Sequence, residues 1–200
     1  DEPLSNLDAK LRTEMRASLK RLHRDLNATT VYVTHDQIEA LTLSDRVIIM
    51  NEGRIMQEGS PYDIYHHPAN IFVAEFIGDP GINLFDGIID NGMIKCGEIQ
   101  IPLPNNFTKN KGSLILGVRP EKIEVSETKK NGWQEVSTGI IQPTGANTII
   151  EVKAGETSIT LLQNGFITLP ENSKLWINLE LDTLSFFDPE TRENLRNNVG

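Results

Sequence analysis

The first fifty residues combine a long helical pattern with short apolar segments. Over 9–26, apolar side chains recur every three or four positions and basic side chains occupy the other faces. This spacing predicts an amphipathic helix, and Asp8 stands where a side chain caps the first turn. The β-branched and aromatic run 29–34 predicts a buried strand. A short helix is expected over 37–43.

The following residues predict a hairpin and two more helices. Residues 46–50 and 54–58 flank a turn-forming Asn-Glu-Gly segment and are expected to pair as strands. Ser60-Pro61-Tyr62-Asp63 supplies an N-cap, a proline at the first helical position and an acid three residues after the cap. A helix therefore begins there, and another is expected over 69–77, ended by Gly78.

Helical periodicity stops after residue 80. Asn91-Gly92 is the strongest short hairpin signal in the chain. Short strands separated by Gly, Asn and Pro are expected over 84–90, 93–101, 113–118, 122–125, 134–141, 148–152, 157–162 and 174–181. Regularly spaced short strands predict an all-β barrel or sandwich. The pattern therefore divides the chain into two domains, residues 1–80 and 81–200.

Composition narrows the function classes. Of 200 residues, 38% are hydrophobic, which is enough for real cores, and the formal net charge is -9. That charge disfavours a general electrostatic grip on nucleic acid, so no nucleic-acid partner is expected. No apolar run approaches the roughly 20 residues of a membrane-spanning helix, so no direct membrane insertion is expected. The single cysteine, Cys96, excludes a disulfide within the chain.

Two places carry candidate chemistry. Asp1-Glu2 is a pair of adjacent acids, and carboxylates of this kind can hold a hard cation such as Mg²⁺ and polarise an attacking water. Taken alone, two such acids are more often solvated surface. His35 lies between a predicted strand and a predicted helix, at the kind of sheet edge where α/β proteins place ligands. A histidine at such a point can also serve only a local hydrogen bond.

The order of the motifs makes a family resemblance specific. The chain reads Asp1-Glu2-Pro3-Leu4-Ser5-Asn6-Leu7-Asp8, then an amphipathic helix and a strand, then Thr34-His35-Asp36-Gln37 with Glu39-Ala40, and Ser44-Asp45-Arg46-Val47. In motif type, order and spacing, this series closely resembles the second half of an ABC transporter nucleotide-binding subunit.

The resemblance implies a role for each matching residue. Asp1 corresponds to the last residue of the Walker B motif, a magnesium ligand, and Glu2 to the catalytic carboxylate that orients or activates the hydrolytic water. Ser5 to Asp8 correspond to the D-loop, which reaches across to the other subunit of an ATP sandwich, so Ser5 and Asp8 are expected to help bind the nucleotide. His35 corresponds to the switch histidine, which contacts the γ-phosphate and takes part in catalysis. Phosphoryl transfer depends on such positioning and charge neutralisation.

The resemblance continues into the second domain. Gly59 to Tyr65 and Pro68 to Gly78 are similar to the tail of importer ATPases that carry an added regulatory domain. Gly117-Val118-Arg119-Pro120-Glu121 and Phe187-Asp188-Pro189-Glu190-Thr191 look like hallmarks of the transport-associated OB-like (TOBE) domain of maltose and multiple-sugar importers. Without the resemblance, the segment around Arg119-Pro120-Glu121 would be interpreted as a turn with an ion pair, and Phe186-Phe187 as part of a hydrophobic core.

Two motifs of a complete ATPase do not occur in this sequence. There is no Gly-x-x-x-x-Gly-Lys-Ser/Thr loop to cradle phosphates and no Leu-Ser-Gly-Gly-Gln signature. The expected fold is thus an α+β two-part chain: an incomplete P-loop NTPase α/β domain, then an all-β OB-like (TOBE or MOP-like) barrel. Such a chain should leave exposed sheet edges and apolar faces within residues 1–80.

The resemblance implies the ATP-hydrolysing subunit of an ABC importer, for sugars by preference. ATP and Mg²⁺ would serve the full-length protein, whereas this chain alone should bind them weakly and be inactive as an ATPase. A second copy of the protein and membrane permease subunits are the implied partners, at the cytoplasmic side of the cell membrane. Two alternatives stay open: a stand-alone OB-like module for small ligands or nucleic acid, and a non-transport ABC-type ATPase.

Overall fold

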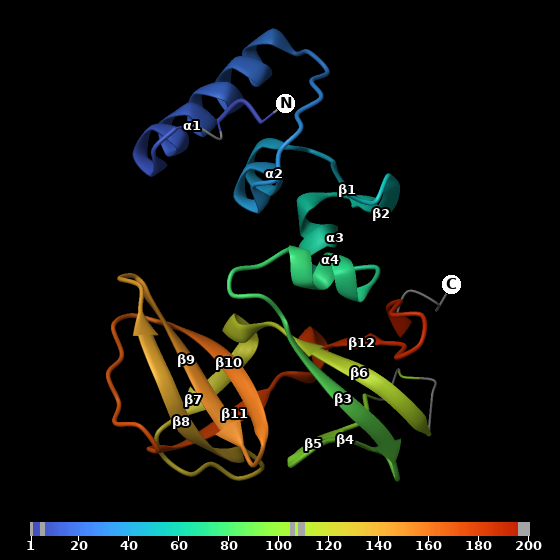
Figure 1. Ribbon diagram of the computed structural model, residues 1–200, viewed down its shortest axis with the longest axis vertical. Helices are drawn as coiled ribbons and strands as arrows, with labels where there is room; N and C mark the ends of the chain where they lie inside the picture. Colours follow the sequence, from blue (N-terminus) through green and yellow to red (C-terminus); the bar gives the residue numbers. More distant parts are fainter. Residues whose placement is uncertain (1, 5–6, 105–106, 108–110, 196–200) are drawn as a thin grey trace. The chain divides into compact units, whose positions relative to one another are not determined.

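The chain forms two compact units, residues 1–67 and 68–200 (Figure 1). A computed structural model describes residues 2–4, 7–104, 107 and 111–195. Each unit is described by itself. The predicted metal ligand Asp1 and the predicted nucleotide contact Ser5 lie outside the described residues.

The first unit is mainly helical, and local sequence signals set where its helices begin. Its elements are α1 (Ala9–Leu26), α2 (Gln37–Leu43), β1 (Val47–Asn51), β2 (Arg54–Gly59) and α3 (Pro61–His66). Asp8 caps α1 by accepting from Leu11 N, as predicted, and Ser60 caps α3 by accepting from Asp63 N. Strands β1 and β2 pair antiparallel. Within the described residues of this unit, that pair is the whole sheet, and no parallel α/β sheet is seen.

The strand predicted over 29–34 is wrong. The segment is extended but pairs with no described strand, and Val31 and Val33 are 89% and 55% exposed. A β-branched run becomes a strand only when a neighbour takes up its backbone hydrogen bonds, whatever its propensity. The expectation of uncovered apolar faces is confirmed, because Leu22 and Leu26 on α1 are also exposed.

The second unit is predominantly β, as predicted. After α4 (Ile71–Phe76) come β3 (Asn83–Asp90), β4 (Met93–Cys96), β5 (Ile99–Pro102), β6 (Gly112–Val118), β7 (Ile123–Ser126), β8 (Gln134–Pro143), β9 (Asn147–Ala154), β10 (Thr157–Asn164), β11 (Lys174–Leu179) and β12 (Ser185–Phe187). Short 3₁₀ turns span Pro120–Lys122 and Leu181–Thr183. Two antiparallel five-stranded sheets result, in the orders β10-β9-β8-β11-β7 and β12-β6-β3-β4-β5.

Side chains from both sheets share one hydrophobic core. Leu116 and Phe186 from one sheet, with Val152 and Ile177 from the other, are at most 1% exposed within the same cluster. Burial also raises the pKa of the Cys96 thiol to about 11, so this cysteine behaves as a small apolar core residue.

Turn geometry explains the register of the first strands. Asn91 and Gly92 have φ of 50° and 74°, the left-handed values that a tight hairpin requires, and β3 and β4 pair across them as predicted. The predicted strand 93–101 is instead two strands, β4 and β5. The chain reverses at Gly97, whose φ is 58°.

Helix α4 belongs to the β unit, so the division lies thirteen residues before the boundary that periodicity indicated. Ile71 and Ala74 pack against Phe187 of β12. Arg119 is only 5% exposed and donates to Ala74 O at 2.9 Å and to Ile77 O, the last carbonyls of α4. Asn194 holds the residues before the helix by donating to Pro68 O at 2.8 Å. Contacts between residues distant in sequence therefore set this boundary.

None of the helices in the described ranges combines the length and apolar character that crossing a membrane requires.

Candidate functional site

The structure brings together Glu2 and His35, the two predicted catalytic residues. His35 Nδ1 lies 2.6 Å from Glu2 Oε1. The backbone supports this approach, since Glu2 N–H donates to Val33 O at 2.9 Å. Glu2 itself has a φ of 44°, a left-handed value that is uncommon for a residue with a side chain and often marks functional positions. A carboxylate and an imidazole from distant parts of the sequence thus form one pair.

The pair is electrostatically coupled and open to solvent. The hydrogen bond and the negative charge of Glu2 raise the pKa of His35 above its usual 6.5. The two side chains remain 69% and 43% exposed, for His35 and Glu2 respectively. The Glu2 carboxylate, a hydrogen-bond acceptor, and the His35 imidazole, a titratable donor, are therefore both accessible to a ligand at this surface.

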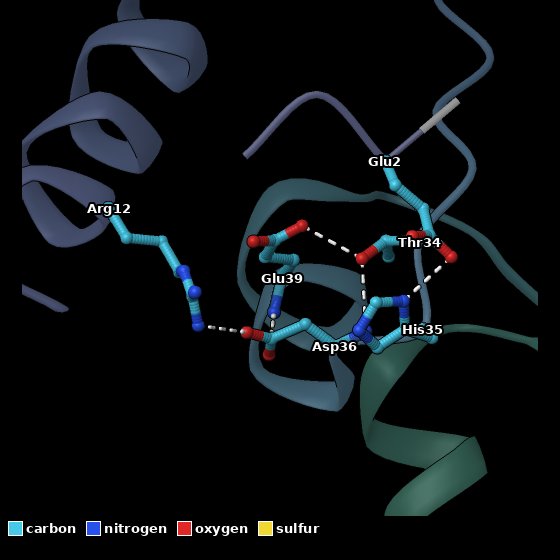
Figure 2. A pocket seen from close by; sticks show the side chains of 6 residues that line it. All are labelled: Glu2, Arg12, Thr34, His35, Asp36 and Glu39. Carbon is cyan, nitrogen blue, oxygen red and sulfur yellow. Dashed lines mark hydrogen bonds and ion pairs between the residues drawn. The ribbon is translucent and has the colours of Figure 1, made fainter. Parts of the chain in front are cut away.

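A small cavity of about 40 Å³ lies beside the pair, and Figure 2 shows the six side chains that line it. They are Glu2, Arg12, Thr34, His35, Asp36 and Glu39. Holding a water molecule takes about 10–15 Å³, whereas small-molecule sites usually need roughly 300 Å³ or more. The cavity has room for water and not for a nucleotide.

Four of these lining residues were not assigned a role from the sequence. Asp36 caps α2, with its Oδ1 accepting from Ile38 N and Glu39 N. Its other oxygen, Oδ2, lies 3.5 Å from Arg12 Nη1. Thr34 Oγ1 accepts from Asp36 N at 3.0 Å. The Asp-x-x-Glu spacing of Asp36 and Glu39 is a pattern typical of a helix start, so it could have indicated α2 but not the cavity.

Asp8 lies at the start of α1, where the sequence predicted a capping residue. Its carboxylate accepts from Leu11 N at 2.9 Å as the N-cap of α1, and it is not among the residues that line the cavity. The structure thus groups Glu2 with His35, gives Asp8 a capping role, and does not describe Asp1 or Ser5.

We expect an NMR titration of this chain to show a His35 midpoint above 6.5. Because folding raises the His35 pKa, the pair stabilises the fold fully below about pH 6.5 and loses that contribution as pH rises through the folded-state pKa. Glu2→Gln removes the cause and should return the midpoint toward 6.5. His23 serves as the control, since its resonance should not respond to the substitution. A His35 midpoint that ignores Glu2→Gln would contradict the pairing.

Comparisons with known proteins agree with the motifs. A family model described as the CysA C-terminal regulatory domain matches residues 83–125. The sn-glycerol-3-phosphate import ATP-binding protein UgpC of Escherichia coli is 40% identical over 199 residues, 98% of this chain and 56% of that protein. The xylose/arabinose import ATP-binding protein XacK of Haloferax volcanii is 38% identical, covering 98% of this chain and 54% of its own length.

A third relative, the oligosaccharides import ATP-binding protein MsmX of Bacillus subtilis, is 37% identical, with 98% of this chain and 57% of that protein covered. The chain thus spans about half the length of these curated relatives. Among solved structures, the cytoplasmic molybdate-binding protein ModG aligns with a TM-score of 0.42 and 12% identity, covering 54% of this chain and 96% of that one. At that score, neither its fold nor its ligand is carried over.

The resemblance read from the motifs is thereby confirmed: over nearly its whole length, this chain is a relative of the ATP-binding proteins of ABC importers, and residues 83–125 match the family model of the CysA C-terminal regulatory domain.

Proposed function

We propose that the protein containing this chain is the ATP-hydrolysing subunit of an ABC importer and couples ATP binding and hydrolysis to solute uptake. The observation that carries this proposal is the contact between Glu2 and His35, 2.6 Å apart and beside a cavity with room for water. Those two residue types at that separation can position a hydrolytic water against a phosphoryl group.

The chemistry follows from the two side chains. Glu2 orients the attacking water and accepts one of its protons, a role that typically contributes about 10²–10⁴ to a rate. His35 presents its imidazole to the γ-phosphate, where a hydrogen bond stabilises negative charge as it develops. Glu2 favours the charged form of His35, which suits an anionic partner.

Mg²⁺ is assigned to Asp1 by motif position, as is the contact of Ser5 and Asp8 with the nucleotide across a dimer. A carboxylate is the ligand that Mg²⁺ prefers, so the residue type fits. The ion, when bound, neutralises phosphate charge. Activation of the water and stabilisation of the phosphate charge are assigned to Glu2 and His35. Both side chains are exposed enough to contact a bound nucleotide.

The solute is proposed to be a sugar or a related polyol phosphate. The relatives are named for import of xylose and arabinose, oligosaccharides and sn-glycerol-3-phosphate. By the same kinship, the partners are a second copy of the protein and membrane permease subunits, and the protein works at the cytoplasmic face of the membrane.

We expect this chain alone to release phosphate from ATP no faster than a blank, because it contains no phosphate-cradling loop. A protein of the relatives' length that contains this sequence should hydrolyse ATP. With its permease in liposomes, it should do so faster when a transported sugar is supplied. Measurement of phosphate release checks all three preparations. Absence of hydrolysis by the longer protein, or turnover by this chain alone at a similar rate, would overturn the proposal.

A further inference from the structure

Glu39 is a charged side chain buried in the first unit that the proposed mechanism does not use. It lies in α2 and is 2% exposed. Burying a carboxylate is costly unless its charge and lone pairs are satisfied. A buried carboxylate such as Glu39 therefore needs hydrogen-bond or ion-pair partners.

The partners of Glu39 come from the segment that leads to His35. Tyr32 OH and Thr34 Oγ1 both donate to Glu39 Oε2, at 3.0 and 2.8 Å. Arg16 Nη2 of α1 lies 3.8 Å from Glu39 Oε1. Burial and the bond to Glu39 raise the pKa of Tyr32 to about 12, so its hydroxyl remains a donor at any physiological pH. Glu39 thus ties the extended segment to α2.

Asp36, the residue after His35, is also held by hydrogen bonds, as Thr34 before it is. Asp36 Oδ2 accepts from Arg16 Nη2 at 2.8 Å, and Asp36 N–H donates to Thr34 Oγ1 at 3.0 Å. Thr34 Oγ1 therefore joins Glu39 on one side to the Asp36 backbone on the other. Figure 2 shows the two bonds of Thr34, to Glu39 and to Asp36.

His35 itself has little packing to hold it. Its side chain is 69% exposed, and its contact with Glu2 is made at the surface. The direction of such a side chain depends mainly on the backbone that carries it. The bonds of Thr34 and Asp36 fix that backbone at both neighbours of His35. Glu39 contributes the bond that Thr34 Oγ1 donates, whereas Arg16 holds the Asp36 carboxylate.

We propose that Glu39 is a positioning residue for hydrolysis: through Thr34, it holds residues 34–36 so that the His35 imidazole faces Glu2. The catalytic consequence rests on the proposed function, whereas the contacts are properties of this chain. Glu39 touches neither substrate nor reacting atoms, so its removal should affect the rate of turnover more than the binding of ATP.

Steady-state kinetics of the longer protein test this idea. Glu39→Ala should lower kcat by about 10²-fold, the effect that a displacement of about 1 Å can have. The KM for ATP should stay within about twofold, because uniform binding is not removed. Glu39→Gln keeps an oxygen that can accept from Thr34, so it should recover most of the lost kcat.

Three further variants separate positioning from simple stability. Thr34→Val breaks the link to the residues around His35 and should reproduce the kcat loss of Glu39→Ala. The double variant should be no slower than either single one, because both substitutions break one connection. Tyr32→Phe removes a bond to Glu39 but leaves the Thr34 link, so it should lower the melting temperature while kcat stays near that of the unsubstituted protein.

Glu14→Gln is the matched control, since Glu14 is exposed on α1. An unsubstituted protein that hydrolyses ATP, together with folded Glu39→Ala and Thr34→Val variants of normal kcat, would overturn the positioning role and leave the proposed function standing. Equal loss in Tyr32→Phe and Thr34→Val would also overturn it, because stability alone would then explain the effect. An unsubstituted protein without hydrolysis would remove both proposals.

Discussion

Glu2→Gln in the full-length protein stops ATP turnover while ATP still binds. The amide matches the carboxylate in size but is a very weak base, so the water beside it is no longer activated. We expect the hydrolysis rate to fall by about 10²–10⁴-fold. The affinity for ATP should stay unchanged, because Glu2 is not part of a phosphate-cradling loop and is an exposed side chain at the edge of a water-sized cavity.

The measurement pairs phosphate release with equilibrium binding of a fluorescent ATP analogue. Glu14→Gln changes the same chemical group at an exposed position of α1 and should leave both quantities unchanged. Near-normal hydrolysis by Glu2→Gln would contradict a catalytic role for Glu2. The contact between Glu2 and His35 would then not serve catalysis.

Phe186→Ala destabilises the β unit by about 3–5 kcal/mol, the usual cost of deleting a buried phenylalanine ring. Phe186 lies in β12 and is 0% exposed. Its ring centroid is 4.9 Å from that of Phe107, and its strand pairs with β6. Alanine would therefore leave a cavity in the core that both sheets share.

Urea unfolding followed by tryptophan fluorescence reports on this unit, because Trp133 and Trp176 both lie within it. Phe166→Ala is the matched control: Phe166 is 71% exposed, and its loss should change the free energy of unfolding by no more than about 0.5 kcal/mol. Equal effects of the two substitutions would show that the core does not depend on Phe186.

Short-range rules accounted for most of the elements. The Ser60 cap with Pro61 begins α3, and Asn91-Gly92 turns β3 into β4, because each signal acts within a few residues of itself. The amphipathic spacing after Asp8 likewise gives α1. In these places, backbone geometry and one or two hydrogen bonds decide the outcome.

The failures have a common cause. Residues 29–34 have strand propensity, yet a strand also needs a paired neighbour, and none of the described strands supplies one. The domain boundary differs from the predicted one because α4 is held by Arg119 and Phe187, which lie far along the chain from it.

 Ile71 and Ala74 of that helix pack against Phe187, more than a hundred residues later in the sequence. Contacts at that separation leave no local pattern to read.

The candidate site divides in the same way. Motif order singled out Glu2 and His35, whereas nothing local marked Glu39 as buried or joined it to Thr34. Its burial depends on Arg16 of α1 and on the path of the extended segment, both of which are set by folding. The supporting network could therefore be found only once the side chains were placed in space.

By itself, the sequence determined the kinship with ABC importer ATP-binding proteins, the helix starts and the β character of the second unit, and it singled out Glu2 and His35 as the proposed catalytic pair. Each of these depends on residue type and spacing along the chain. Only the tertiary structure decided that Glu2 meets His35 at 2.6 Å, that Glu39 is buried and bonded to Thr34, and that α4 joins the β unit. These depend on contacts between residues far apart in sequence, whose free energy is gained only when the whole unit packs.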